Sequence, residues 1–174
     1  MKADVFSAIG SILAKLHSLD SPLTKSVSRE QRLIEMDKKI AKLAQAFPAF
    51  GGELMQLSRR IRSELTDLPA LNPVVIHGDI HIGQFMLTAD NTVAILDFDG
   101  CSYGDPAQDL ADMLVDPHLN QSGRGLVIAQ NPLLPVEFAV SMLTTYQEHA
   151  PHMVSSQAIV WQSRVQLVNK AYRA

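Results

Sequence analysis

Cysteine is almost absent from this sequence of 174 residues, and long apolar runs are missing. The one cysteine, Cys101, cannot form an internal disulfide, so we expect a core without covalent support and a reducing, cytoplasmic location. No apolar run reaches the roughly 18 residues that a membrane-spanning helix needs, and Asp4 interrupts the N-terminus where a signal peptide would be apolar. We therefore expect no targeting segment and no membrane partner.

Charge is also scarce, at 19% of the residues, whereas 47% are hydrophobic. This balance excludes a disordered tail or a low-complexity linker. The length allows one domain with a sizeable core and is too short for two ordinary domains. We therefore expect a single domain over residues 1–174.

Lysine and arginine are absent from residues 71–123, which contain eight aspartates. Aspartates that come together without a basic partner repel each other, so this segment predicts a bound divalent cation. Asp90, Asp112 and Asp116 fit a simpler interpretation as solvated turn and cap residues. The acidic middle also argues against nucleic acid as a partner, because phosphate backbones require clustered cations.

Apolar spacing predicts helices on both sides of a short β-rich segment. In the first part of the chain, three- and four-residue spacing predicts helices over residues 3–18, 28–45 and 51–65. Residues 134–148 and 154–172 show the same spacing, and Trp161 is expected in the core. The fold class is therefore mostly α with a small β-hairpin cluster (α+β).

Three short β-branched or apolar runs follow Pro73, at residues 74–76, 85–87 and 93–96. Between and after them lie two polar, glycine-containing loops, residues 77–84 and 97–100. Polar loops on a rigid scaffold are where chemistry is usually found.

The helix that follows these loops has a clear start. Asp105, Pro106 and Gln108 form a predicted N-cap, a first-turn proline and a closing glutamine for a helix that continues to about Val115. Residues 117–132 are expected to be a loop, in which Ser122–Gly125 are read as flexible chain.

Three oxygen-bearing side chains fall at a spacing that one hairpin can bring together. Asp79 precedes Gln84 by five residues, and Gln84 precedes Asp97 by thirteen. Carboxylate and amide oxygens suit Mg²⁺. Phosphoryl transfer needs such a set, because one carboxylate orients the attacking hydroxyl while the other oxygens hold the metal.

The segments HGDIHIGQFML and VAILDFDGCSYGDPAQDLADML resemble the catalytic core of the aminoglycoside phosphotransferase and choline kinase-like small-molecule kinases, which share the protein-kinase fold. IGSILAKLHSL resembles the helix that begins their C-terminal lobe. The resemblance covers roughly residues 6–116, with the catalytic core at 73–116 and C-terminal helices at 133–174.

The resemblance assigns roles by position. It implies that Asp79 is the catalytic aspartate, that Gln84 replaces the metal-binding asparagine and that Asp97 matches the aspartate corresponding to the DFG motif of protein kinases. His77 and Asp109 match positions that brace the catalytic loop. It also implies Mg²⁺, ATP or GTP as co-substrate, and a small-molecule hydroxyl acceptor held by the helices beyond residue 133.

The sequence departs from this family in two respects. Gln84 reaches one methylene further than asparagine, and Gly83-Gln84 is similar to the maltokinase branch, which hints at a sugar acceptor. No GxGxxG loop and no lysine-bearing strand precede the first helix, so we expect that the N-terminal lobe is absent. Exposed apolar surface would then favour self-association or a partner.

Several of these residues have alternative interpretations. His77, Asp79 and His81 form an H-x-D-x-H pattern that could ligate a transition metal, although no further ligand set is evident. Asp99 is either a partner of the metal site or an ordinary loop residue. Cys101 is read as a packed side chain, because no basic neighbour lowers its pKa.

Two functions follow from these patterns. The first is a phosphotransferase that moves the γ-phosphate of a nucleoside triphosphate to a hydroxyl of an aminoglycoside, a sugar or an amino alcohol. The alternative is an inactive, truncated remnant that serves as a binding module or as half of a split enzyme. The Asp79, Gln84 and Asp97 set favours the first, and the missing lobe favours the second.

Overall fold

The computed structural model describes residues 3–90, 92–115 and 136–173. In chain order the main elements are α1 (Ala3–His17), α2 (Arg29–Ala46), α3 (Gly51–Glu64), β1 (Val74–Ile76), β2 (Phe85–Leu87), β3 (Val93–Ile95), β4 (Ser102–Gly104), α4 (Pro106–Val115), α5 (Val136–His149) and α6 (Ser156–Arg173). Short 3₁₀ helices cover Ile82–Gln84 and Phe98–Gly100. No helix among the described residues is long and apolar enough to cross a membrane.

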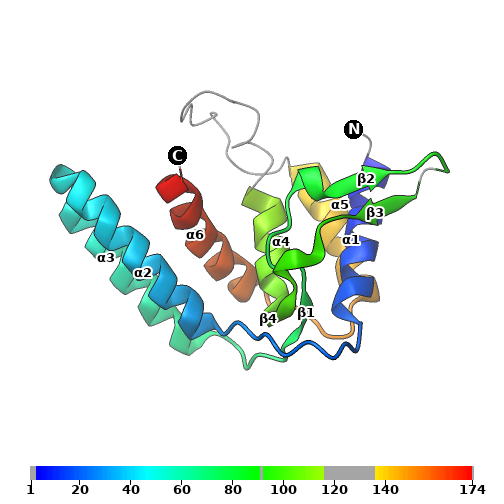
Figure 1. The fold of residues 1–174 in the computed structure, drawn as a ribbon, viewed down its shortest axis with the longest axis horizontal. Coiled ribbons are helices and arrows are strands. Elements are labelled where there is room, and N and C mark those ends of the chain that lie inside the picture. The colour runs from blue at the N-terminus through cyan, green and yellow to red at the C-terminus, as the bar shows by residue number, and fades with distance from the viewer. Residues whose placement is uncertain (1–2, 91, 116–135, 174) are drawn as a thin grey trace.

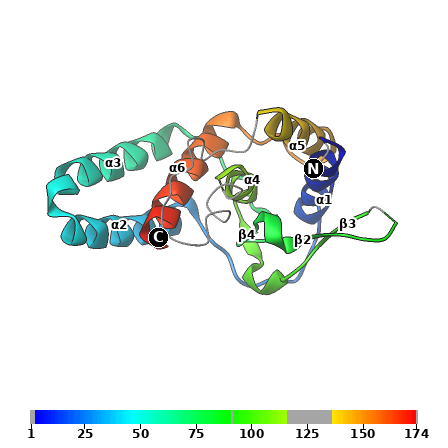
Figure 2. The ribbon, with the colours of Figure 1, turned by 90° about the horizontal axis from the view of Figure 1, so that it is seen from above.

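The helices form two groups joined by α6. Helices α2 and α3 form an antiparallel hairpin at one end of the molecule, and α1 and α5 lie side by side at the other (Figures 1 and 2). Gly10 permits this second pairing, because a Cβ on Gly10 would lie 2.2 Å from the carbonyl oxygen of Met142. Helix α6 packs against α2, α3 and α4, so it links the two ends of the fold.

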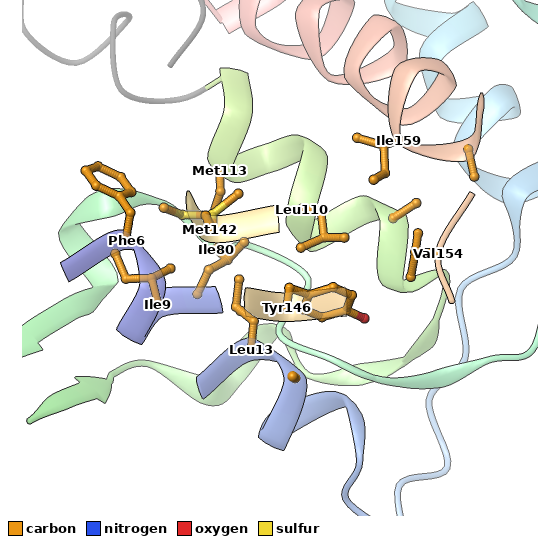
Figure 3. Close-up of a cluster of buried hydrophobic side chains, with 13 residues drawn as sticks. Phe6, Ile9, Leu13, Ile80, Leu110, Met113, Met142, Tyr146, Val154 and Ile159 are labelled. Atoms are coloured by element: carbon orange, nitrogen blue, oxygen red, sulfur yellow. The ribbon is translucent and has the colours of Figure 1, made fainter. Parts of the chain in front are cut away.

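Two clusters of buried side chains correspond to these groups. The larger contains Leu13, Leu110 and Tyr146 from α1, α4 and α5 (Figure 3). The smaller is formed by α2, α3 and the centre of α6, where Trp161 donates its indole N–H to the carbonyl oxygen of Ile61 at 2.8 Å. Since Ile159 belongs to the first cluster and Trp161 to the second, α6 contributes to both.

The strands form two antiparallel pairs. Strand β2 pairs with β3, with Phe85 opposite Ile95, and this is the hairpin expected from the sequence. Strand β1 pairs with β4, with Val75 opposite Tyr103. The sequence analysis missed β4, because Ser-Tyr-Gly carries little β-strand signal of its own and its pairing with β1 is non-local.

The predicted helices match the structure to within a few residues at each boundary. Helix α2 begins at the expected capping box, with Gln31 N donating to Ser28 Oγ and Ser28 N donating to Gln31 Oε1. The second capping box is wrong: Gln108 does not close back on Asp105 but donates to the carbonyl oxygen of Gly78 at 3.2 Å. The loop expected over 117–132, including Ser122–Gly125, and Asp116 lie outside the described residues.

Candidate functional site

Two loops cross in backbone contact at the centre of the candidate site. Gly78 has φ +82°, and a Cβ there would lie 2.6 Å from the carbonyl oxygen of Gly100. A Cβ on Gly100 would in turn lie 2.8 Å from the carbonyl oxygen of His77 and 3.6 Å from the Cβ of Asp79. The two glycines therefore allow the loop after β1 and the loop after β3 to lie against each other.

Hydrogen bonds of the buried His77 and Asp109 side chains hold these two loops in place. His77 Nε2 lies 2.9 Å from the carbonyl oxygen of Leu96, at the end of β3. The two oxygens of Asp109 accept the backbone N–H groups of His77 at 2.7 Å and Gly78 at 3.0 Å. Asp109 thus holds the backbone on the N-terminal side of Asp79, and His77 ties that loop to the one carrying Asp97.

Asp109 is fully buried and held as an ionised carboxylate. Its Oδ2 lies 3.1 Å from His17 Nε2, while His17 Nδ1 lies 2.8 Å from the hydroxyl of Tyr146. Burial works to raise the pKa of Asp109, but the hydrogen bond and charge of His17 and the two backbone amides outweigh it and lower that pKa. These contacts connect α4 with α1 and α5, so they link the candidate site to the larger cluster of buried side chains.

Gln84 and Asp97 lie side by side, as the hairpin spacing predicts. Leu96 N donates to the carbonyl oxygen of Gln84 at 2.8 Å, and Gln84 Nε2 donates to Asp97 Oδ2 at 3.3 Å. Asp97 has φ 60° and ψ 74°, and it is the one non-glycine residue with positive φ in the described part of the chain. Such a conformation is costly for an L-residue.

The side chains of Gln84 and Asp97 fit a hard divalent cation. A carboxylate and an amide supply oxygen ligands, and half a turn of the Gln84 amide places its oxygen where the nitrogen now lies. Among the described residues no group of three or more His, Cys, Asp and Glu side chains could hold a metal ion. Two protein ligands are nevertheless what Mg²⁺ commonly takes, because water and phosphate oxygens complete its shell.

Asp79 is exposed and lies at the edge of a cavity of about 530 Å³. Its backbone nitrogen would lie 3.5 Å from a Cβ on Gly100, so Asp79 is next to the loop of Asp97 and also lines this cavity. The cavity is lined by residues of α2, α4 and α6 and by both loops. The sequence analysis expected the helices beyond residue 133 to form an acceptor pocket; α6 lines this cavity, α2 does so as well, and no α5 residue does.

Asp112 corrects one expectation from the sequence. Instead of a solvated turn or cap residue, it is a helical residue in α4 that is 3% exposed and lines the cavity. Its Oδ1 is buried without a hydrogen-bond partner among the described residues. Burial, with added repulsion from Asp109 and Asp79, raises the pKa of Asp112 to about 8, against the opposing charges of Arg32 and Lys170.

The sequence analysis expected a bound cation to balance the charge of the acidic segment, but two of its aspartates have partners within the protein. Arg29 Nε donates to Asp105 Oδ2 at 2.6 Å, and His17 pairs with Asp109. Asp105 Oδ1 also accepts the backbone N–H of Ala107 at 3.0 Å, so it is the N-cap that the sequence predicts. Arg29 and His17, which lie outside the acidic segment, therefore pair with two of its aspartates by tertiary contact.

The remaining candidates have local roles in the structure. His81 Nδ1 accepts the backbone N–H of Gly83 at 3.1 Å, and Asp90 accepts hydrogen bonds from Thr88 and Thr92 in an exposed turn. Asp99 is exposed in the short 3₁₀ helix directly after Asp97. Burial, with repulsion from Asp109, raises the pKa of the Cys101 thiol, which disfavours the reactive thiolate.

The sequence analysis missed Arg32 and underestimated Asp112. Arg32 lines the cavity, and its Nε and one terminal nitrogen are buried without partners among the described residues. Helical spacing could have found Asp112, because it follows Asp109 by three residues and so shares one face of α4 with that buried aspartate. The facing arginines on α2, Arg29 and Arg32, recur at three residues.

Comparisons with known proteins identify the family and the fold of the chain. A model described as "Phosphotransferase enzyme family" matches residues 2–133, which is most of the chain. An uncharacterized protein of Synechocystis is 27% identical over 110 residues, covering 62% of this chain and 30% of that protein. The chain therefore spans about a third of the length of this relative.

Two solved structures share the fold. An aminoglycoside-3'-phosphotransferase of type VIII superposes with a TM-score of 0.67 at 19% identity, covering 95% of this chain and 60% of the other. A glucosamine kinase in complex with glucosamine, ADP and inorganic phosphate gives a TM-score of 0.67 at 20% identity, covering 99% of this chain and 52% of the other. Both similarities concern the fold, which is that of small-molecule kinases.

Proposed function

Because the chain belongs to the phosphotransferase enzyme family, we propose that it transfers the γ-phosphate of a nucleoside triphosphate to a hydroxyl group of a small molecule. The observation that carries the proposal is the position of Asp97. It has a left-handed backbone conformation beside Gln84, at the start of a loop that lies against the loop of Asp79. Strain of this kind persists where the surroundings hold it, and such positions cluster at active sites.

Asp79 is the residue proposed to act on the acceptor. Asp79 lines the cavity next to the loop of Asp97, and we propose that a hydroxyl in the cavity donates a hydrogen bond to its carboxylate. As the hydroxyl oxygen forms its bond to the γ-phosphorus, the bond from that phosphorus to the bridging oxygen breaks and the hydroxyl proton passes to Asp79. Asp109 and His77 keep the Asp79 loop in place during this step.

Gln84 and Asp97 are proposed to hold Mg²⁺. When bound, the ion supplies positive charge to the phosphate oxygens of the nucleotide. The side chains of Gln84 and Asp97 lie close enough to share one ligand, and the exposure of Asp97 leaves room for phosphate and water. The Phe98–Gly100 helix continues from Asp97 directly to the glycine contact that sets the spacing to Asp79.

We also propose that the chain uses a nucleotide and a small hydroxyl compound as its two substrates. The glucosamine kinase of similar fold is described in complex with glucosamine and ADP, which supports a nucleotide and a small hydroxyl compound here. This chain covers 52% of that kinase, and we propose that a further segment or partner, equivalent to an N-terminal lobe, completes the nucleotide site.

Calorimetric titration of the chain with ATP and GTP, with and without Mg²⁺, tests the phosphate and metal part of the proposal. We expect metal-dependent binding that Asp97→Ala removes. Asp99 is exposed on the same turn, so Asp99→Ala is the matched control and should preserve the binding. Incubation with Mg²⁺, nucleotide and a panel of sugars and amino alcohols then tests for transfer. Equal binding by the Asp97→Ala protein would contradict the proposed metal site. No binding by either protein would contradict an activity of this chain on its own and favour a binding module or half of a split enzyme.

A further inference from the structure

The two loops of the candidate site carry no cationic side chain of their own. Residues 71–123 contain neither lysine nor arginine, whereas Asp79, Asp97 and Asp99 all lie in these loops. A bound triphosphate would add several negative charges beside these carboxylates, and one divalent cation offsets only part of them. A further cation of this chain at the site therefore has to come from outside residues 71–123.

Lys25 is a cation that the structure places where the two loops cross. Its Nζ donates a hydrogen bond to the carbonyl oxygen of Gly100 at 3.4 Å. This is the same oxygen that would lie 2.6 Å from a Cβ on Gly78, the residue directly before Asp79. Lys25 also lines the cavity of about 530 Å³ together with Asp79. Its ammonium group is therefore next to both loops of the candidate site.

Hydrogen bonds to strand β4 fix the backbone around Lys25. Tyr103 N donates to the carbonyl oxygen of Lys25 at 2.9 Å, and Val27 N donates to the carbonyl oxygen of Tyr103 at 2.8 Å. The hydroxyl of Tyr103 donates to the carbonyl oxygen of Ser21 at 2.9 Å, so the connection between α1 and α2 is held to β4 on both sides of Lys25 (Figure 1). Since β4 pairs with β1, which leads into the loop of Asp79, Lys25 has a fixed position relative to that loop.

The ammonium group of Lys25 is open to a ligand. The residue is exposed and takes part in none of the ion pairs among the described residues. An ammonium group has three N–H donors, and the contact with Gly100 uses one of them. The charge of Lys25 also acts within the loop, where it opposes the rise in the pKa of the Cys101 thiol. Lys25 therefore has both charge and donors left for an anionic ligand.

On the basis of the proposed phosphotransferase function, we propose that Lys25 binds the phosphate group that is transferred. A lysine binds phosphate as a compact point charge, and its free donors match phosphate oxygens. While the γ-phosphorus exchanges its bond to the bridging oxygen for a bond to the acceptor oxygen, Lys25 stabilises the negative charge on the remaining phosphate oxygens. The hydroxyl proton passes to Asp79, so Lys25 keeps its own proton throughout.

Inorganic tripolyphosphate is the probe, because it presents the phosphate chain without a nucleoside and so needs no further segment to hold the base. Calorimetric titration with Mg²⁺ compares wild type with two variants. Lys25→Met keeps a flexible apolar stem and removes the charge, so we expect the affinity to fall at least about tenfold, the loss typical of a hydrogen bond to a charged group. Lys15 is exposed on α1 and does not line the cavity, so Lys15→Met is the matched control and should bind like wild type.

Direct contact is measured by NMR on the ¹³Cε signal of Lys25, which is assigned by its absence from the spectrum of Lys25→Met. Tripolyphosphate should shift this signal saturably, at the concentrations that saturate the calorimetric signal. The side chain of Lys25 is exposed and its backbone makes the contacts with β4, so Lys25→Met should unfold at the same urea concentration as wild type.

Four results would overturn the proposal: no saturable binding by wild type, an unchanged Lys25 signal, wild-type affinity in Lys25→Met, or an equal loss in Lys15→Met. Asp97→Ala separates this inference from the proposed function. Binding that depends on Lys25 but on neither Mg²⁺ nor Asp97 would contradict the proposed metal site and leave the Lys25 phosphate site standing. Binding that depends on Mg²⁺ and Asp97 but not on Lys25 would overturn the role of Lys25 and leave the phosphotransferase proposal intact.

Discussion

Gly78 and Gly100 lie back to back, with the carbonyl oxygen of Gly100 2.6 Å from the place where a Cβ on Gly78 would stand. This contact brings together the loop of Asp79, which precedes β2, and the loop of Asp97, which follows β3. The positive φ of Gly78 adds a second reason for glycine at this position.

Gly78→Ala is expected to separate the two loops and weaken nucleotide binding. The added methyl group meets a backbone oxygen, and the residue would have to keep a left-handed conformation, so we expect a loss of about 1–3 kcal/mol in unfolding free energy. Gly52→Ala is the matched control, because a Cβ there meets nothing within 4 Å and Gly52 lies within a helix. Urea unfolding measures the difference, and equal stability of the two variants would contradict it.

Asp97→Gly is expected to stabilise the protein while removing metal-dependent nucleotide binding. Glycine adopts φ 60° without steric cost, so relief of strain should raise the unfolding free energy by about 1 kcal/mol. Asp99→Gly, at negative φ, should instead destabilise slightly and keep the binding. Thermal unfolding combined with calorimetry checks both effects. A destabilised Asp97→Gly protein would show that the Asp97 side chain supports the fold.

Asp109→Asn is expected to destabilise the protein by about 3–5 kcal/mol at neutral pH, because it breaks a buried pair and leaves His17 unmatched. The folded-state pKa of Asp109 is lowered, so its stabilisation is present above the usual value of 3.8 and is lost as the pH falls through the lowered pKa. The gap between wild type and variant in urea unfolding should therefore narrow in acid. The exposed Asp67→Asn is the control, and a gap that is constant from pH 7 to pH 3 would contradict the prediction.

Local sequence signals were sufficient for much of the fold. Helical spacing, the Ser28–Gln31 capping box and the Asp105-Pro106 start predicted the helices because each depends on neighbours within one turn. The hairpin placed Gln84 beside Asp97 for the same reason, since a short turn fixes its register.

Contacts between distant segments could not be predicted in this way. The sequence analysis considered the charge of the acidic segment by itself. In the structure Asp105 pairs with Arg29 and Asp109 pairs with His17, which are 76 and 92 residues away in the sequence. Strand β4 depends on its pairing with β1, because its own residues have little β-strand propensity. The lining of the cavity by α2 belongs to the same class, because it depends on how the α2–α3 hairpin packs on α6.

Asp109 and Asp112 stand on one helix, and their pKa values move in opposite directions. Asp109 receives two backbone amides and His17, which stabilise its charge more than burial opposes it. Asp112 is buried as well, but its Oδ1 receives no hydrogen bond from the described residues, and Asp109 and Asp79 repel its charge. Burial alone therefore does not set the charge of a carboxylate in α4, and the donors within reach decide it.

Asp112→Asn is expected to stabilise the protein at neutral pH. The pKa of Asp112 is about 8 when folded against 3.8 ordinarily, so its favourable contribution is complete below about pH 4 and is lost as the pH rises through 8. Relative to the variant, wild type should lose up to about 1.4 kcal/mol of unfolding free energy per pH unit between these values. Urea unfolding from pH 4 to pH 9 measures this slope, with the exposed Asp20→Asn as control. Parallel curves for wild type and Asp112→Asn would mean that Arg32 and Lys170 keep Asp112 ionised throughout.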